Sequence, residues 1–263
     1  MDFGIEIDDL ADLPDAVASH RLVVRRGRAP TLDQQIALTA RLGSVVGSAP
    51  DVAQVRYEDD RRIRADHAYF NEQWHADVSW SAEGPVVSVL CALVIGRGAA
   101  ATSFADTVSG FARLTPAVSD RAATATALHH VERSRHLRHG RGSPAAGRTR
   151  RRFRAAPPAI GARPPTLVDE PGAAHPLVVP TRSGPGLTIG DHAWTIDGVD
   201  AEQGAAFVDD LQRRVVDAAD TYTHRWQRGD VVAFDNRSVL HRREPAPLAR
   251  RRILRRTIAW PPG

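Results

Sequence analysis

The sequence contains no lysine, so all of its 35 basic residues are arginine, set against 31 acidic residues. The net charge is only +4, and the pI of about 10.1 reflects the very high pKa of the guanidinium group more than a strongly basic surface. The bias toward arginine, together with abundant alanine, glycine and proline, is typical of a high-GC bacterium and suggests a secondary-metabolite pathway. Basicity therefore argues only weakly for a nucleic-acid partner.

Cysteine and long apolar runs are also scarce. The one cysteine, Cys91, excludes an internal disulfide, and its place in an apolar run is typical of a small core residue. No apolar run approaches the roughly 20 residues of a membrane-spanning helix. The acidic first residues lack the basic and apolar regions of a signal peptide. We therefore expect a cytoplasmic protein with no membrane partner.

A length of 263 residues, 42% hydrophobic and 25% charged, fits one soluble globular domain over residues 1–263. The second half is dominated by short β-branched runs, with helices expected around them. This pattern favours a mainly β protein with flanking helices (α+β), either a β-sandwich or a jelly roll. At about 131–165 an arginine-rich segment without apolar periodicity predicts an insertion, either a solvated loop, a lid over a site or an anion-binding arm.

Several elements follow from local patterns. We expect a helix over 5–20 and a strand over 21–25, and the capping box Thr31–Gln34 predicts another helix. Further strands are expected at 86–95, 102–106 and 251–260. A second capping box at Asp200 starts a helix with one apolar face. A hairpin is expected from 222–226 and 231–235.

His75 and Asp77 form a His-x-Asp pair in a segment with an extended pattern, in which alternate side chains share one face. An imidazole and a carboxylate side by side can bind a divalent metal weakly, and His241, far along the chain, offers a third ligand. Two histidines and one carboxylate on one face of an iron leave its other positions open. Four further histidines have no carboxylate or regular framework beside them, and we reject them as ligands: His129, His130, His136 and His139.

The motifs Trp-His-Ala-Asp-Val-Ser-Trp, Gly-Asp-Val-Val-Ala-Phe-Asp-Asn-Arg-Ser-Val-Leu-His and Arg-Arg-Ile-Leu-Arg-Arg-Thr occur in this order. Together with Thr102 they resemble the taurine dioxygenase (TauD/TfdA) family of Fe(II)- and 2-oxoglutarate-dependent oxygenases. The resemblance implies a double-stranded β-helix, a cupin-like jelly roll, with the cofactors Fe(II), 2-oxoglutarate and O2. It implies a metal site at His75, Asp77 and His241. It also implies oxidation of a small molecule, coupled to conversion of 2-oxoglutarate into succinate and CO2.

The distal carboxylate of 2-oxoglutarate needs a fixed cation, and arginine offers a planar fork. Strand alternation places Arg252 and Arg256 on one face, with Arg256 between two apolar neighbours, so Arg256 is preferred as the clamp and Arg252 is the alternative. The resemblance adds Thr102 to the 2-oxoglutarate site, although Ala100 and Ala101 replace the Gly-Asp that usually precedes this threonine. It places Asn71 near the substrate, where a loop-capping role is equally compatible.

The outcome of the reaction stays open between hydroxylation, which we favour, and desaturation, epoxidation or cyclisation. Asp77 argues against halogenation, which needs a small residue at this ligand position. Arg242 and Arg243 favour an acidic small-molecule substrate. A different class of function, a nucleic-acid-binding jelly roll that uses the arginine-rich insertion, predicts binding that falls steeply with salt, and we expect no such partner. A homo-oligomer is compatible with the sequence.

Overall fold

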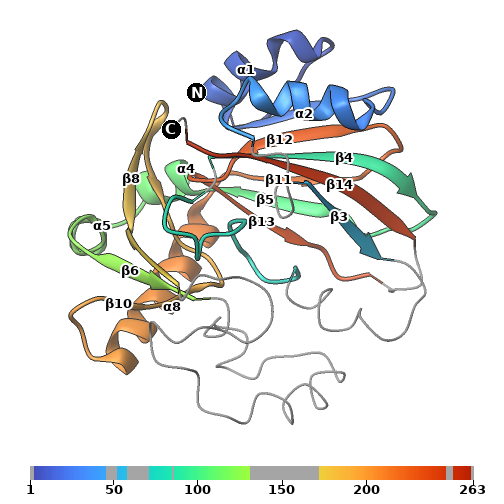
Figure 1. Ribbon diagram of the computed structural model, residues 1–263. Helices are drawn as coiled ribbons and strands as arrows, with labels where there is room; N and C mark the ends of the chain where they lie inside the picture. Colours follow the sequence, from blue (N-terminus) through green and yellow to red (C-terminus); the bar gives the residue numbers. More distant parts are fainter. Residues whose placement is uncertain are drawn as a thin grey trace.

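The computed structural model describes residues 3–45, 52–57, 71–84, 86–130, 172–246 and 251–261. Two β-sheets face each other, and helices lie outside them (Figure 1). This is the mainly β architecture with flanking helices that the sequence predicts. The arginine-rich segment expected at about 131–165 lies outside the described residues.

The larger sheet has six strands in the order β1-β2-β12-β4-β14-β3. Its strands are β1 (Ile5–Glu6), β2 (Leu22–Arg25), β12 (Val231–Asp235), β4 (Val87–Ile95), β14 (Arg252–Ala259) and β3 (Val52–Tyr57). Alternation divides β4 between two cores. Val89 and Cys91 pack toward the helices, whereas Leu90 and Ala92 pack toward the second sheet. Both faces of the central strands are buried, which explains the continuous apolar run in the sequence.

The 3₁₀ helix η1 (Leu10–Asp12) and the helices α1 (Leu13–His20) and α2 (Leu32–Ala40) cover the outer face of the larger sheet (Figure 1). The capping box predicted at Thr31 is present, because Thr31 accepts from the Gln34 N–H and Gln34 accepts from the Thr31 N–H. The helix expected over 5–20 is shorter than predicted, because Ile5–Glu6 form β1 and the α-helix begins only at Leu13. Arg21 ends α1 with a left-handed backbone (φ 64°).

The smaller sheet has the order β11-β5-β13 and consists of β11 (Thr221–His224), β5 (Thr102–Asp106) and β13 (Val239–Arg243). Its inner face packs against the larger sheet through Phe104, which lies 5.3 Å from the Phe234 ring between ring centroids. Thr102 and His241 have the same parity as the buried Phe104 and Val239 of their strands. The sandwich therefore directs both toward its interior.

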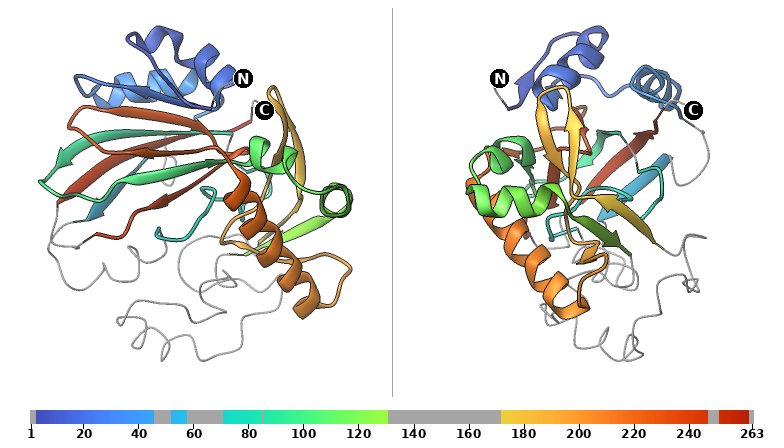
Figure 2. Two further views of the ribbon diagram at one scale, coloured as in Figure 1. Left: turned by 180° about the vertical axis from the view of Figure 1, so that it is seen from behind. Right: turned by 90° about the vertical axis from the view of Figure 1, so that its left-hand side faces the viewer.

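A third layer lies beside the sandwich (Figure 2). It contains the sheet β10-β6-β7 and the β8-β9 pair, covered by α4, α5 and α8. Phe207, Leu211 and Val215 form the buried face of α8, as the sequence pattern predicts, and Asp200 caps its first turn. The bounds are β6 (Thr126–His129), β7 (Ala173–Pro176), β8 (Val178–Thr181), β9 (Gly184–Leu187), β10 (Ala193–Ile196), α4 (Thr107–Ala112), α5 (Pro116–Ala123) and α8 (Ala201–Ala218).

Two local predictions are wrong. The expected hairpin of 222–226 with 231–235 does not form, because β11 pairs with β5 in the smaller sheet and β12 pairs with β2 and β4 in the larger one. The His75–Asp77 segment is not a strand but a turn-rich stretch with a single bridge, from His75 to His241. Across the described residues, every helix is too short or too polar to cross a membrane.

Candidate metal centre

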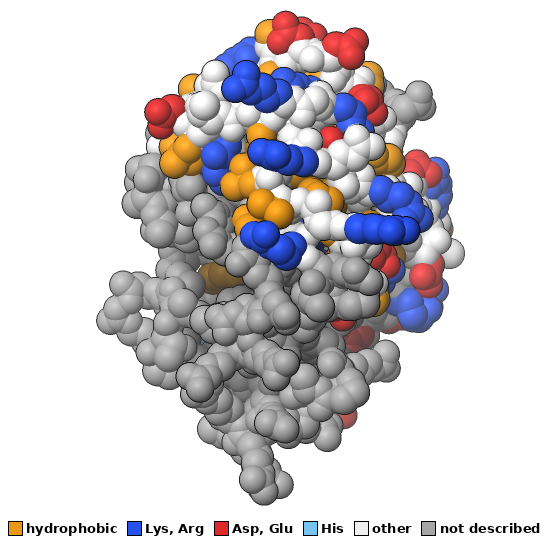
Figure 3. All heavy atoms as spheres, turned by 90° about the vertical axis from the view of Figure 1, so that its right-hand side faces the viewer, with side chains coloured by type: hydrophobic (Ala, Val, Ile, Leu, Met, Phe, Trp, Pro, Cys, Tyr) orange, Lys and Arg blue, Asp and Glu red, His pale blue; other side chains and the backbone are white. Residues whose placement is uncertain are grey.

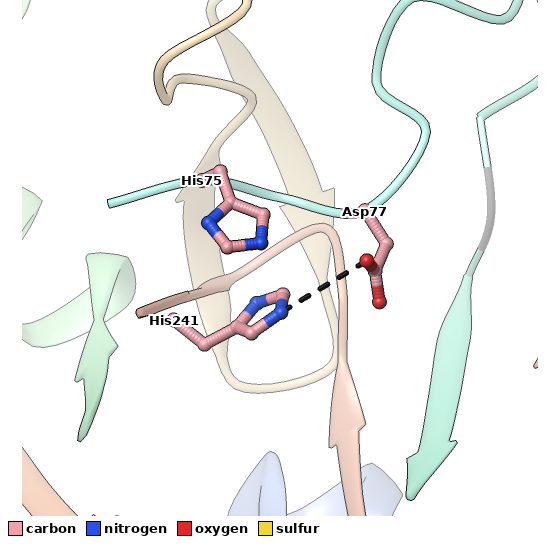
Figure 4. A group of neighbouring side chains, drawn as sticks. All are labelled: His75, Asp77 and His241. Carbon is pink, nitrogen blue, oxygen red and sulfur yellow. Dashed lines mark ion pairs between the residues drawn. The ribbon is translucent and has the colours of Figure 1, made fainter. Parts of the chain in front are cut away.

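His75, Asp77 and His241 come together in the fold (Figure 4). One potential ligand atom from each lies within 4.8 Å of the other two, and all three residues are buried. The two imidazole rings lie 4.2 Å apart, and His241 Nε2 is 3.9 Å from Asp77 Oδ1. Among the residues that the structure describes, this is the only such cluster of metal-ligating side chains.

Backbone pairing brings the two distant stretches together. The His75 N–H donates to the His241 carbonyl at 3.0 Å, and the His241 N–H donates back to the His75 carbonyl at 2.9 Å. Asp77 is held two residues further on, where Ser88 donates a 2.7 Å hydrogen bond to Asp77 Oδ2. The fold therefore places the three side chains together without a regular strand at 75–77.

Both histidines present a ring nitrogen that suits a metal ligand. His75 Nδ1 lies 2.7 Å from the Gln73 carbonyl, which can only accept, so Nδ1 donates to it and Nε2 is the ring nitrogen left for a metal. Burial and the neighbouring His75 lower the pKa of His241 to about 3, although Asp77 opposes this shift. His241 is therefore a neutral imidazole at neutral pH, the form that binds a metal.

Asp77 is ionised despite being buried. Burial alone would raise the pKa of this carboxyl, but Arg256, His241, His75 and Ser88 outweigh it and hold the pKa well below its ordinary value. The strongest of these partners is Arg256, whose Nη1 donates to Asp77 Oδ1. Two imidazoles and one carboxylate form the donor set that non-haem Fe(II) prefers, and the residues present therefore fit this ion.

A second set of polar side chains lies beside the three candidate ligands, in a cavity that they share. The Thr102 hydroxyl accepts a hydrogen bond from Arg252 Nη2 and another, at 2.9 Å, from Trp226 Nε1. The Arg252 guanidinium also lies over the Trp226 ring, 5.6 Å from its centroid. Thr102 and Arg252 are both almost fully buried. Arg252 thus comes from the larger sheet, Thr102 from the smaller sheet, and Trp226 from the connection between β11 and β12.

The predicted residues line one cavity, which also contains residues that the sequence did not single out. Its full lining is Asn71, His75, Asp77, Leu90, Thr102, His241, Arg243, Arg252, Leu254 and Arg256. Both candidate clamp arginines are present, as the alternation predicts. Arg243 is bound to Glu72 in this wall, at 2.5 Å. Arg242 faces away from the cavity, packing over the Trp74 ring at 4.6 Å, so of the two extra arginines only Arg243 reaches the cavity.

Two of the four rejected histidines, His129 and His130, are buried at the end of β6. His136 and His139 lie outside the described residues, and the rejection of all four as ligands stays a prediction. Ser88 and Trp226 contact site residues but were missed. A serine at an inward position of an otherwise apolar strand was the available signal for Ser88. Trp226 had no comparable signal, because it follows a strand and precedes an ordinary turn.

Comparison with known proteins agrees with this geometry. Residues 4–258 match the family described as "Taurine catabolism dioxygenase TauD, TfdA family". The alpha-ketoglutarate-dependent 2,4-dichlorophenoxyacetate dioxygenase of Cupriavidus pinatubonensis is 28% identical over 89% of this chain and 83% of its own. The (S)-phenoxypropionate/alpha-ketoglutarate-dioxygenase of Delftia acidovorans is also 28% identical, over 91% of this chain and 82% of its own.

A solved structure shows the same fold. The crystal structure of AAD-2 in complex with Mn(II) and N-oxalylglycine superposes with a TM-score of 0.77 and 18% identity, covering 99% of this chain and 96% of that one. The predicted double-stranded β-helix is thereby confirmed.

Proposed function

This chain belongs to the TauD/TfdA family of dioxygenases, and we propose that it hydroxylates a small carboxylic acid at a site built from His75, Asp77 and His241. It is a 2-oxoglutarate-dependent oxidoreductase whose cofactors are Fe(II), 2-oxoglutarate and O2. The observation that carries the proposal is the convergence of the three ligands with two arginines in one buried cavity. We take residues 1–263 as one oxygenase domain.

His75, Asp77 and His241 would hold the iron. When bound, Fe(II) supplies the redox chemistry that couples conversion of 2-oxoglutarate into succinate and CO2 to oxidation of the substrate. Burial keeps the His241 imidazole neutral, and Arg256 helps to keep the Asp77 carboxylate ionised, so both side chains are in the form that binds a metal. Burial leaves all three ligands little contact with bulk water.

Thr102 and Arg252 are proposed to bind the distal carboxylate of 2-oxoglutarate. A threonine hydroxyl has two lone pairs and one proton. Both lone pairs accept here, from Arg252 and Trp226, so the Thr102 proton must be donated elsewhere, and the cavity is on this side. A carboxylate placed there would accept from Thr102 and from the Arg252 guanidinium together. The clamp role thus passes from Arg256 to Arg252, the alternative in the sequence analysis.

Arg256 is proposed to bind the carboxylate of the substrate. Its guanidinium donates to Asp77 Oδ1, the oxygen that also faces His241. A divalent cation among the three ligands would compete for this oxygen and repel Arg256, which would then need another anion in the cavity. The names of the two relatives identify substrates with a carboxylate, a phenoxyacetate and a phenoxypropionate. We propose a substrate of this class, with Asn71 beside it.

The experiment is anaerobic loading with Fe(II) and 2-oxoglutarate, followed by O2 and a panel of aryloxyalkanoic and other small carboxylic acids. We expect a weak visible charge-transfer band on 2-oxoglutarate addition and succinate formation that depends on the acid. Asp77→Ala should abolish both. A wild-type protein that shows neither the band nor succinate would contradict the proposal.

The roles of the two arginines can be separated. Arg256→Gln should raise KM for the acid, with a smaller effect on the 2-oxoglutarate KM, and Arg252→Gln should do the reverse. The loss of one charge-assisted hydrogen bond, about 1.5–3 kcal/mol, corresponds to roughly a 10- to 100-fold change. The opposite pattern would restore the clamp to Arg256.

Desaturation, epoxidation and cyclisation use the same cavity and are distinguished by the product. The nucleic-acid alternative is less favoured. On the face shown in Figure 3, arginine side chains are interspersed with acidic and hydrophobic ones, unlike a continuous basic surface. A place in secondary metabolism and a homo-oligomer stay predictions from the sequence.

A further inference from the structure

One side chain holds both backbone polar groups of Asp77. Asn236 Oδ1 accepts from the Asp77 N–H at 2.8 Å, and Asn236 Nδ2 donates to the Asp77 carbonyl at 2.9 Å. Asn236 is buried and 159 residues away in sequence. The side-chain amide thus takes the place that a neighbouring strand would occupy, at a point where Asp77 belongs to no strand.

Asn236 is itself firmly placed. It follows β12, and its own N–H donates to the Val86 carbonyl at 3.0 Å, at the start of β4. The preceding residue, Asp235, receives a hydrogen bond from Ser238 at the turn into β13. Asn236 is therefore fixed to the larger sheet and lies in the connection that leads to His241. It joins the two stretches that supply the ligands.

The backbone beside Asp77 needs such support. Val78 has φ 48°, in the left-handed region that a β-branched residue rarely adopts. Residues with such a backbone persist only where surrounding contacts hold them. Ser88 and Arg256 hold the carboxylate oxygens of Asp77, and the Ser81 N–H donates to the Val78 carbonyl, but these bonds do not involve the Asp77 backbone. The two hydrogen bonds of Asn236 hold this backbone directly.

We propose that Asn236 is a positioning residue of the metal centre, which sets the direction of the Asp77 carboxylate relative to His75 and His241. This inference rests on the proposed function, because it takes these three residues as the metal ligands. A turn-forming role alone would make Asn236 important for folding. The positioning role makes it important for metal affinity as well.

Asn236→Ala tests the inference in the metal-free protein, titrated with Mn(II) by calorimetry without 2-oxoglutarate. We expect the affinity to fall about 10- to 100-fold, the effect typical of losing a group that orients a ligand. The matched control is Gln35→Ala. Gln35 is also a buried amide that bridges backbone and side-chain groups, at Val89 and Thr257, but on the helix side of the larger sheet. We expect this variant to bind Mn(II) as the wild type does.

Thermal unfolding of both variants accounts for the structural contribution. If Asn236→Ala unfolds earlier, as Gln35→Ala does, yet binds Mn(II) with wild-type affinity, the inference is overturned and the proposed function stands. If the wild type does not bind Mn(II), both fail. Should Asn236→Ala not fold, Asn236→Ser, which keeps one hydrogen-bonding group, is titrated instead. Weakened binding there supports the inference, and unchanged binding overturns it.

Discussion

The Thr102 hydroxyl accepts hydrogen bonds from Arg252 and Trp226 and has one proton left to donate. Its immediate neighbour Ser103 points to the opposite face of β5, where it donates to Glu244 at 2.6 Å. The two adjacent hydroxyls of β5 therefore lie in different surroundings. The Thr102 hydroxyl lies in the cavity of the candidate metal centre, and the Ser103 hydroxyl lies outside it.

We predict that Thr102→Val raises the KM for 2-oxoglutarate about 10- to 100-fold, because a hydrogen bond to a charged group is worth about 1.5–3 kcal/mol. Steady-state kinetics with varied 2-oxoglutarate measure this change. Thr102→Ser, which keeps the hydroxyl, should stay near the wild-type value, as should Ser103→Ala. Equal effects of Thr102→Val and Ser103→Ala would count against the assigned role.

At this scale the sequence singled out three side chains that the structure brings together, because a histidine and an aspartate two residues apart carry a recognisable chemistry. It could not predict the partners of Asp77. Asn236 and Ser88 have ordinary local patterns, and their contacts depend on how distant segments approach each other. Arg252 and Arg256 were correctly placed on one face of the strand. Strand alternation does not say which of them would bind 2-oxoglutarate and which would bind the substrate.

Among the elements, α8 lies unusually close to β10. Gly204 is in the first turns of α8, and a Cβ at this position would lie 2.8 Å from the Ile196 backbone nitrogen. The contact is with backbone and cannot move away easily. The side chain of Thr195 on β10 also donates to the Ala201 carbonyl at 3.1 Å, which holds the start of the helix against the strand.

We therefore predict that Gly204→Ala lowers the free energy of unfolding by about 1–3 kcal/mol, the usual cost of overpacking. In an open helix position the same change would stabilise by roughly 0.5–1 kcal/mol. Denaturant unfolding measures the difference. The exposed Ala206, two residues on, serves as the control, since Ala206→Gly should show only the loss of helix propensity. A stabilised Gly204→Ala protein would mean that α8 and β10 are further apart.

Element prediction succeeded where local chemistry decides. The capping box at Thr31, the helix start at Asp200 and the apolar run of β4 were placed correctly from their residues, although Asp200 forms an N-cap without the return bond of a capping box. It failed where pairing partners decide. β11 and β12 look like a hairpin because a turn with Gly229 joins them, but β11 pairs with β5 in the smaller sheet and β12 pairs with β4 in the larger one.

On the scale of the whole molecule, three buried histidines among the described residues have a pKa well below the ordinary value. Burial, with His175 and His192, lowers the pKa of His129 to about 3, and burial with His75 does the same for His241. For His224, burial and Arg26 lower the pKa to about 4. In the unfolded chain each would titrate near pH 6.5. Unfolding between these values takes up protons, so the free energy of unfolding falls as the pH decreases from about 6.5.

We predict that urea unfolding of the metal-free protein shows a steep loss of stability between pH 6.5 and 4.5. His129→Gln should reduce the slope by up to one proton, because it removes one group that is neutral only in the folded state. His129 is chosen because it is not a metal ligand. If the slope is unchanged, His129 does not take up a proton on unfolding, and its pKa in the folded protein is not lowered.

Cys91 lies on β4 beneath α1 and α2 and is completely buried. Burial raises the pKa of its thiol, so little thiolate is present at neutral pH. As the sole sulfhydryl in the chain, it can be modified by a thiol reagent only when this layer of helices lifts from the sheet. The rate at which a thiol reagent labels Cys91 therefore reports how often the helices separate from the sheet, and no engineered cysteine is needed to measure it.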